Sequence, residues 1–162
     1  MRIAVVLFLS LLTVAGQTPS DQDDDVWETV FRYQFEHNAS GDDGTAGAFY
    51  LCLPGEKNDP LPEFMKRFEG HKTPVRVCSA SHYQKGLGIV DNDSGPRGIQ
   101  FRLGSIKWIS AVEIEVHGSY YVNVLNSSGN TYTAKKQDLK WSVTKNVTHF
   151  IASLRPLTSA KL

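Results

Sequence analysis

His149 is the residue whose type and predicted position best suit chemistry, because histidine titrates near neutral pH. The alternation of apolar residues that ends at Ile151 places His149 on the apolar face of a strand. There it could act as an acid, a base or a ligand anchor in a pocket shared with Tyr33, His37 and Tyr120. The alternative, which is the commoner state of such a histidine, is a neutral, hydrogen-bonded core residue.

The other polar residues do not form a recognisable catalytic motif. The sequence has no nucleophile-elbow motif and no glycine-rich phosphate loop. His71 and His82 flank a predicted strand and could converge, but no two histidines have the spacing of metal ligands on one element. Glu113, Glu115 and His117 alternate on the polar face of a strand, where solvation is the ordinary state. We therefore expect no catalytic residue, no metal site and no cofactor.

Two large apolar residues, Ile106 and Trp108, fall on a strand face that is otherwise polar, near the tip of a predicted hairpin. Either the N-terminal segment covers them, or they form an exposed patch for a protein partner. Both possibilities stay open at the level of the sequence.

The two cysteines, Cys52 and Cys78, lie in predicted strands that flank one helix. These strands could be neighbours in the fold, and export would make a disulfide possible. The alternative is a pair of buried thiols that behave as small apolar residues. Two cysteines without a nearby pair of histidines do not make a zinc site.

The stretch from Gly98 to Ile151 predicts a four-strand antiparallel meander with its apolar residues on one face. Turns are expected at Ser110-Ala111, within Leu125–Asn130 and at Gln137-Asp138. A slip of one residue would turn a strand inside out, so the register should follow this alternation. The predicted partners include Leu103 with Gly118, Phe101 with Tyr120, Ala134 with Trp141, and Tyr132 with Val143.

The N-terminal half must supply the cover for this apolar face. Apolar residues at helical spacing predict a helix over Val26–His37, and a second helix should begin at Asp59-Pro60 and end near Gly70. Short strands are expected over Ala48–Leu53 and Val75–Ser81. The predicted fold class is α+β, in which two N-terminal helices cover a curved antiparallel sheet with a C-terminal meander.

Composition and the N-terminus bear on the compartment. The chain has 162 residues, with 17 Lys and Arg against 17 Asp and Glu, so its net charge is zero. Because there is no excess of positive charge, we do not expect nucleic acid as a partner. Residues 1–16 have the charged start, apolar core and small-residue end of a secretory signal, and the apolar run is too short to span a bilayer. We expect cleavage near Gly16, a flexible segment over 17–25, one domain over 26–152 and a loose tail over 153–162.

Several segments resemble a group of small exported bacterial proteins of unknown function. These segments are Phe31–Gly41, Phe64–Phe68 with Gly70-His71, Ser105–Ser110 and Ser128–Tyr132. The resemblance implies an exported bacterial origin, but it does not point to any activity. The order of elements resembles the NTF2-like or cystatin-like architecture. In a eukaryotic secreted protein, unlike a bacterial one, some of the sequons at Asn38, Asn92, Asn126 and Asn146 would carry glycans.

These observations favour an exported, non-enzymatic binding or interaction module, with an unknown protein or small molecule as its partner. The alternative is a small-molecule carrier or enzyme of NTF2-like type, with a cavity between sheet and helices lined by Tyr33, His37, Tyr120 and His149. The oligomeric state stays open.

Overall fold

The computed structural model describes residues 19–38, 46–54, 59–95 and 97–153. The expected signal peptide and most of the expected C-terminal tail lie outside these residues. The helical elements are α1 (Pro19–His37), α2 (Pro62–Met65), and the 3₁₀ turns η1 (Lys66–Phe68) and η2 (Cys78–Ala80). The strands are β1 (Ala48–Cys52), β2 (Val75–Val77), β3 (Ser81–Gln84), β4 (Gly88–Asp91), β5 (Gly98–Ser110), β6 (Glu113–Asn123), β7 (Asn126–Gln137) and β8 (Lys140–Ser153).

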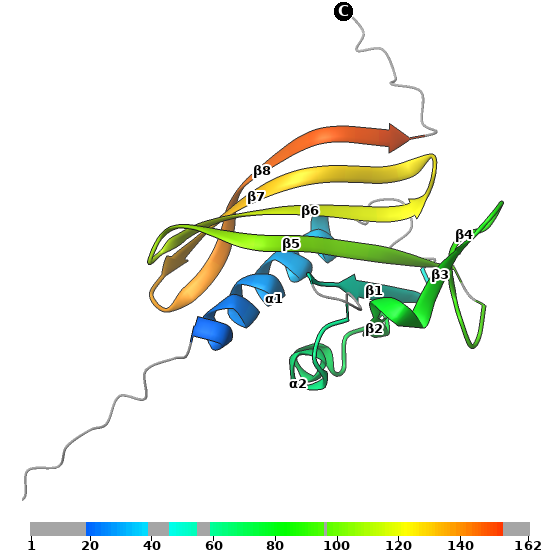
Figure 1. The fold of residues 1–162 in the computed structure, drawn as a ribbon, viewed down its shortest axis with the longest axis horizontal. Coiled ribbons are helices and arrows are strands. Elements are labelled where there is room, and N and C mark those ends of the chain that lie inside the picture. Colours follow the sequence, from blue (N-terminus) through cyan, green and yellow to red (C-terminus); the bar gives the residue numbers. More distant parts are fainter. Residues whose placement is uncertain (1–18, 39–45, 55–58, 96, 154–162) are drawn as a thin grey trace, which may run out of the picture.

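Six strands form one mixed sheet in the order β2-β1-β5-β6-β7-β8 (Figure 1). Strand β1 runs parallel to both β2 and β5, whereas β5 to β8 form an antiparallel meander. Strands β3 and β4 form a separate hairpin. The described helices are not long and apolar enough to span a membrane.

The predicted cover of two N-terminal helices over an antiparallel sheet is wrong. Of the described helices only α1 crosses the sheet, and the second expected helix is reduced to the single turn α2 followed by η1. Pro62 suits a first helical turn, but the stripe of apolar residues is short, and Leu61 within it is exposed. Helix α1 instead begins earlier than predicted, at Pro19, and its acidic first turns suit a helix N-terminus.

The core lies between α1 and the sheet face that α1 crosses, which we call the helix face. Val30, Phe31 and Phe35 of the helix are buried against this face. The ring centroid of Phe35 lies 4.8 Å from that of Phe49 and 5.1 Å from that of Phe101, so β1 and β5 share one aromatic cluster with the helix. The opposite face, which we call the open face, is covered in part by the β3–β4 hairpin through Ile89 and its neighbours.

The register of β5 against β6 is confirmed near the start of β5 and then shifts. Phe101 pairs with Tyr120 and Leu103 with Gly118, as predicted. A β-bulge follows Leu103, and Ile106 then pairs with Val116. One extra residue moves the side chains from Ile106 to Trp108 to the other face, so Ile106 lies on the helix face rather than on the polar one.

The other two turns also differ from the prediction. The loop expected within Leu125–Asn130 is strand from Asn126 onward, because the turn is the pair Val124-Leu125. The last turn is Asp138-Leu139, both with positive φ, one residue later than predicted. The predicted pairings of Ala134 and Tyr132 with β8 are therefore wrong: Ala134 pairs with Val143 and Tyr132 with Asn146.

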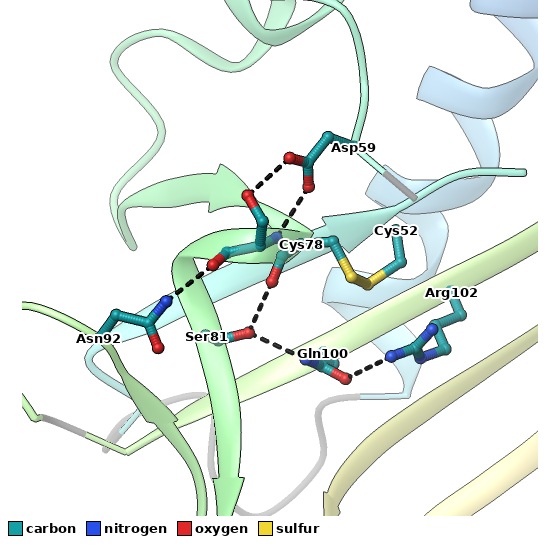
Figure 2. The surroundings of a disulfide bond; sticks show 8 residues. Cys52, Asp59, Cys78, Ser81, Asn92, Gln100 and Arg102 are labelled. Carbon is teal, nitrogen blue, oxygen red and sulfur yellow. Dashed lines mark hydrogen bonds between the residues drawn. A yellow bond between two sulfur atoms is a disulfide. The ribbon is translucent and has the colours of Figure 1, made fainter. Parts of the chain in front are cut away.

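A disulfide joins Cys52, at the end of β1, to Cys78 in η2 (Figure 2). Both cysteines are buried, and the bond ties β1 to the segment that leads into the β3–β4 hairpin. The possibility of two free thiols is thereby excluded. The bond fixes the hairpin at one end of the open face.

Candidate functional site

The residues predicted to line one pocket are divided between the two faces of the sheet. Tyr33 stacks on His37 with 4.0 Å between ring centroids, and it meets Tyr132 edge-on at 5.8 Å. Tyr120 packs against the same core. His149 does not join them, because it lies exposed on the open face.

A β-bulge accounts for the position of His149. In β8, Val143 pairs with Ala134 of β7, but Lys145 pairs with the preceding residue Thr133, which leaves Thr144 as the extra residue. Val147 then pairs with Thr131 on the open face, which is also the face of His149. Nε2 of His149 lies 2.7 Å from Oγ1 of Thr131, on the open face. The strict alternation that predicts a core position for His149 stops at this bulge.

Polar side chains on the helix face hold the C-terminal part of α1 to the sheet. Gln34 donates from Nε2 to the hydroxyl of Tyr132 at 3.3 Å, and Asn38 donates from Nδ2 to Oδ1 of Asn130 at 3.4 Å. Burial raises the pKa of Tyr132, so this phenol stays protonated. The sequence conceals this contact, because Asn130 belongs to a run of polar residues that is typical of a turn.

A second buried polar cluster ties β1, β2 and β4 together. Tyr50 donates a hydrogen bond to the carboxylate of Asp91, and Arg76 forms an ion pair with the same group. The hydrogen bond from Tyr50, with others from backbone amides and Arg76, holds the pKa of Asp91 well below its ordinary value despite burial. Burial, followed by the bond to Asp91, raises the pKa of Tyr50. These groups satisfy one another and form a structural tie between strands.

The open face carries a groove of about 650 Å³ beside the β3–β4 hairpin. Its floor includes Ser119 of β6 and Ser127 of β7. Its walls include Tyr83 of the hairpin, Tyr121 of β6 and Phe150 of β8, with 6.1 Å between the ring centroids of the two tyrosines. Small polar residues between aromatic walls give a concave surface with both apolar and hydrogen-bonding groups, as ligand sites have.

Arg102 lies in this groove, within a row of paired residues that crosses the sheet. The register pairs Arg102 with Ser119, Ser119 with Gly129, and Gly129 with Phe150. Arg102 also borders a second hollow, of about 410 Å³, that reaches Cys52. It therefore stands between two open spaces on the same face.

A chain of hydrogen bonds connects Arg102 to the disulfide (Figure 2). Nη2 of Arg102 donates to Oε1 of Gln100 at 3.0 Å, and Nε2 of Gln100 donates to Oγ of Ser81 at 2.9 Å. The Ser81 hydroxyl in turn donates to the carbonyl of Cys78 at 3.0 Å. In the described part of the chain, no carboxylate forms an ion pair with Arg102. Its charge is therefore oriented by the fold but not neutralised by an acidic side chain among the described residues.

The patch predicted from Ile106 and Trp108 lies on the helix face, near the first turns of α1. Ile106 packs against the core, and Trp108, with 38 % of its surface exposed, meets Trp141 edge-on at 5.6 Å. Nε1 of Trp108 donates to the carboxylate of Asp23 at 3.2 Å. The beginning of α1 thus contacts Trp108. Of the two possibilities that the sequence leaves open, this contact corresponds to cover by the N-terminal segment.

Within the described ranges, no group of three or more His, Cys, Asp or Glu side chains is arranged to hold a metal ion.

No protein-family model, curated protein or solved structure matches this chain. The site must therefore be interpreted from its own geometry. What sequence reasoning missed is the groove residue Arg102, whose only signal was an arginine between apolar neighbours in a strand.

Proposed function

We propose that this protein is an exported, non-enzymatic binding module that takes its ligand in the open-face groove. The ligand class that fits is a molecule or peptide segment with an anionic group beside a planar or apolar part. The observation that carries this proposal is the Arg102 guanidinium, which lies in an aromatic-walled groove without a carboxylate partner among the described residues.

The charge of Arg102 supports an anionic ligand. A guanidinium offers a planar set of N–H donors that matches a carboxylate, sulfate or phosphate group. One Arg102 nitrogen is occupied by Gln100, and the side chain is exposed, so the other donors face solvent. A ligand oxygen could accept from these donors without breaking an ion pair to any described residue.

The aromatic walls support a planar or apolar part next to that anion. Tyr83 and Phe150 expose 46 % and 56 % of their surface, respectively, which is unusual for two large side chains that border the same groove. Covering these rings with a ligand lowers the free energy of the complex, because apolar surface is removed from water. The groove therefore combines one fixed charge with apolar surface that a partner can bury.

Binding rather than catalysis is supported by the groups present in the groove. Ser81 donates its hydroxyl proton to the Cys78 carbonyl, and the ring Nδ1 of His82 bonds to the side chain of Asn92. Neither residue is paired with the other as nucleophile and base. Export is supported by the disulfide, which is typical of oxidising compartments, and by the sequence of residues 1–16.

A titration with 8-anilinonaphthalene-1-sulfonate tests the proposal, because this probe joins an anion to aromatic rings. We expect saturable fluorescence enhancement with the disulfide-intact protein. The variant Arg102→Gln should raise the dissociation constant about tenfold, the equivalent of about 1.4 kcal/mol for one charge-assisted hydrogen bond. Tyr83→Ala should weaken binding by a similar factor because a ring that covers the probe is lost.

Arg97→Gln is the matched control, because Arg97 is also exposed but borders a different hollow. Its dissociation constant should equal that of the wild type. If Arg102→Gln and Arg97→Gln bind the probe equally well, Arg102 does not select an anion and the proposal fails.

A further inference from the structure

We infer that His117 and His149 form a binding site for a transition-metal ion of the imidazole-preferring class: Zn²⁺, Ni²⁺ or Cu²⁺. This inference is independent of the proposed groove function. It starts from three donor atoms on three neighbouring strands. Oγ1 of Thr131 in β7 lies 2.8 Å from Nδ1 of His117 in β6 and 2.7 Å from Nε2 of His149 in β8.

The sheet itself brings these side chains together. Thr131 pairs with His117 across β6 and β7, so both point to the open face. The bulge at Thr144 in β8 places His149 on that face as well, with 6.3 Å between the two imidazole centroids. Bulges are a recurrent means by which sheets re-aim a side chain at a functional position.

A metal ion can take the place of the hydrogen bonds that join these three atoms. A threonine hydroxyl has one proton, so it can donate to only one of the two ring nitrogens. The other ring must therefore carry a proton on the nitrogen that faces Thr131. A metal ion bound by two neutral imidazoles removes this requirement, because each nitrogen then directs its lone pair to the ion.

The distances are close to those that metal coordination needs. Metal–nitrogen bonds of about 2.0–2.1 Å in a tetrahedral site place donor atoms about 3.3 Å apart. The threonine oxygen lies 2.7–2.8 Å from each nitrogen, so each ring nitrogen must move about 0.5 Å away from the hydroxyl to reach this spacing. Both histidines are exposed, and their side chains can make this movement without displacing core residues.

The donor set selects the class of ion. Two neutral imidazoles and a hydroxyl supply no negative charge, so the hard ions Ca²⁺ and Mg²⁺, which need several oxygen ligands, are disfavoured. Imidazole suits Zn²⁺, Ni²⁺ and Cu²⁺. Water molecules would complete the coordination sphere, because the open face is accessible to solvent at this position.

Calorimetric titration of the disulfide-intact protein with NiCl₂ tests this inference. We expect one Ni²⁺ per chain, and an affinity at least about tenfold lower in His117→Gln and in His149→Gln. His82→Gln is the matched control, because His82 is an exposed histidine on β3 whose ring bonds to Asn92. It should bind Ni²⁺ like the wild type.

A spectroscopic measurement shows which atoms coordinate the ion. With one equivalent of Cu²⁺, electron paramagnetic resonance should show two equatorial imidazole nitrogens in the wild type and one in either single variant. Equal urea midpoints of all variants establish that folding is intact. The inference is overturned if wild-type protein binds no Ni²⁺ at about 1 mM, or if both histidine variants keep the wild-type affinity. A loss that His82→Gln shares equally would also overturn it.

Discussion

Removal of the disulfide should lower the stability of this protein by an amount that follows from its position in the chain. Cys52 and Cys78 are separated by 26 positions. In the chain-entropy model, a cross-link of this span removes about 12 cal/mol/K of unfolded-state entropy, which is about 3.5 kcal/mol near room temperature. For a domain of this size, that loss should lower the melting temperature by about 10–15 °C.

Urea unfolding of three samples measures this effect and separates it from packing. The samples are oxidised wild type, reduced wild type, and the double variant Cys52→Ala with Cys78→Ala. If the bond acts through the unfolded chain, the second and third samples should lose about the same stability, and both should show a larger m-value because the unfolded chain expands. If reduced wild type keeps the oxidised midpoint and only the alanine variant is destabilised, the buried sulfur atoms act through packing, and the entropic reasoning is refuted.

Two further perturbations test the buried contacts. Because the hydrogen bond from Tyr50 holds the pKa of Asp91 below its ordinary value, Asp91 contributes stability above pH about 4 that is lost as the pH falls toward its folded-state pKa. Urea midpoints measured against pH should therefore fall on the acid side in wild type, and less steeply in Asp91→Asn. A Cβ at Gly98 would overlap the buried ring of Tyr50, so Gly98→Ala should cost about 1–3 kcal/mol, and an unchanged urea midpoint would contradict this packing.

The sequence predicts the elements of the C-terminal meander well, because each strand has one buried and one wet face. The pairings of Phe101 with Tyr120 and of Leu103 with Gly118 follow from this alternation and are confirmed. The β-bulges break the prediction, since one extra residue reverses the faces of all residues beyond it. Trp108 and His149 are therefore placed on the wrong faces by a period-two pattern that holds only between bulges.

The parallel part of the sheet was harder to predict, although its strand carries a readable signal. All five residues of Ala48–Cys52 are buried, which is typical of a strand that is covered on both faces. The helix face receives Phe49, and the β3–β4 hairpin covers Tyr50 from the opposite side. The sequence indicates a buried strand here, but its partners depend on the disulfide and on the hairpin, which are remote in the chain.

The groove on the open face depends on residues that look like turn formers in the sequence. Gly129 lies in the run predicted as a loop, yet it belongs to β7 and pairs with Ser119 and Phe150. A Cβ at this position would overlap the ring of Phe150, so only glycine lets that ring lie over the strand as the wall of the groove. The composition of the run that contains Gly129 is typical of a flexible loop. In the fold, pairing of β7 with both β6 and β8 makes these residues the floor of the groove. The candidate site is therefore a consequence of register, which is fixed by the whole sheet.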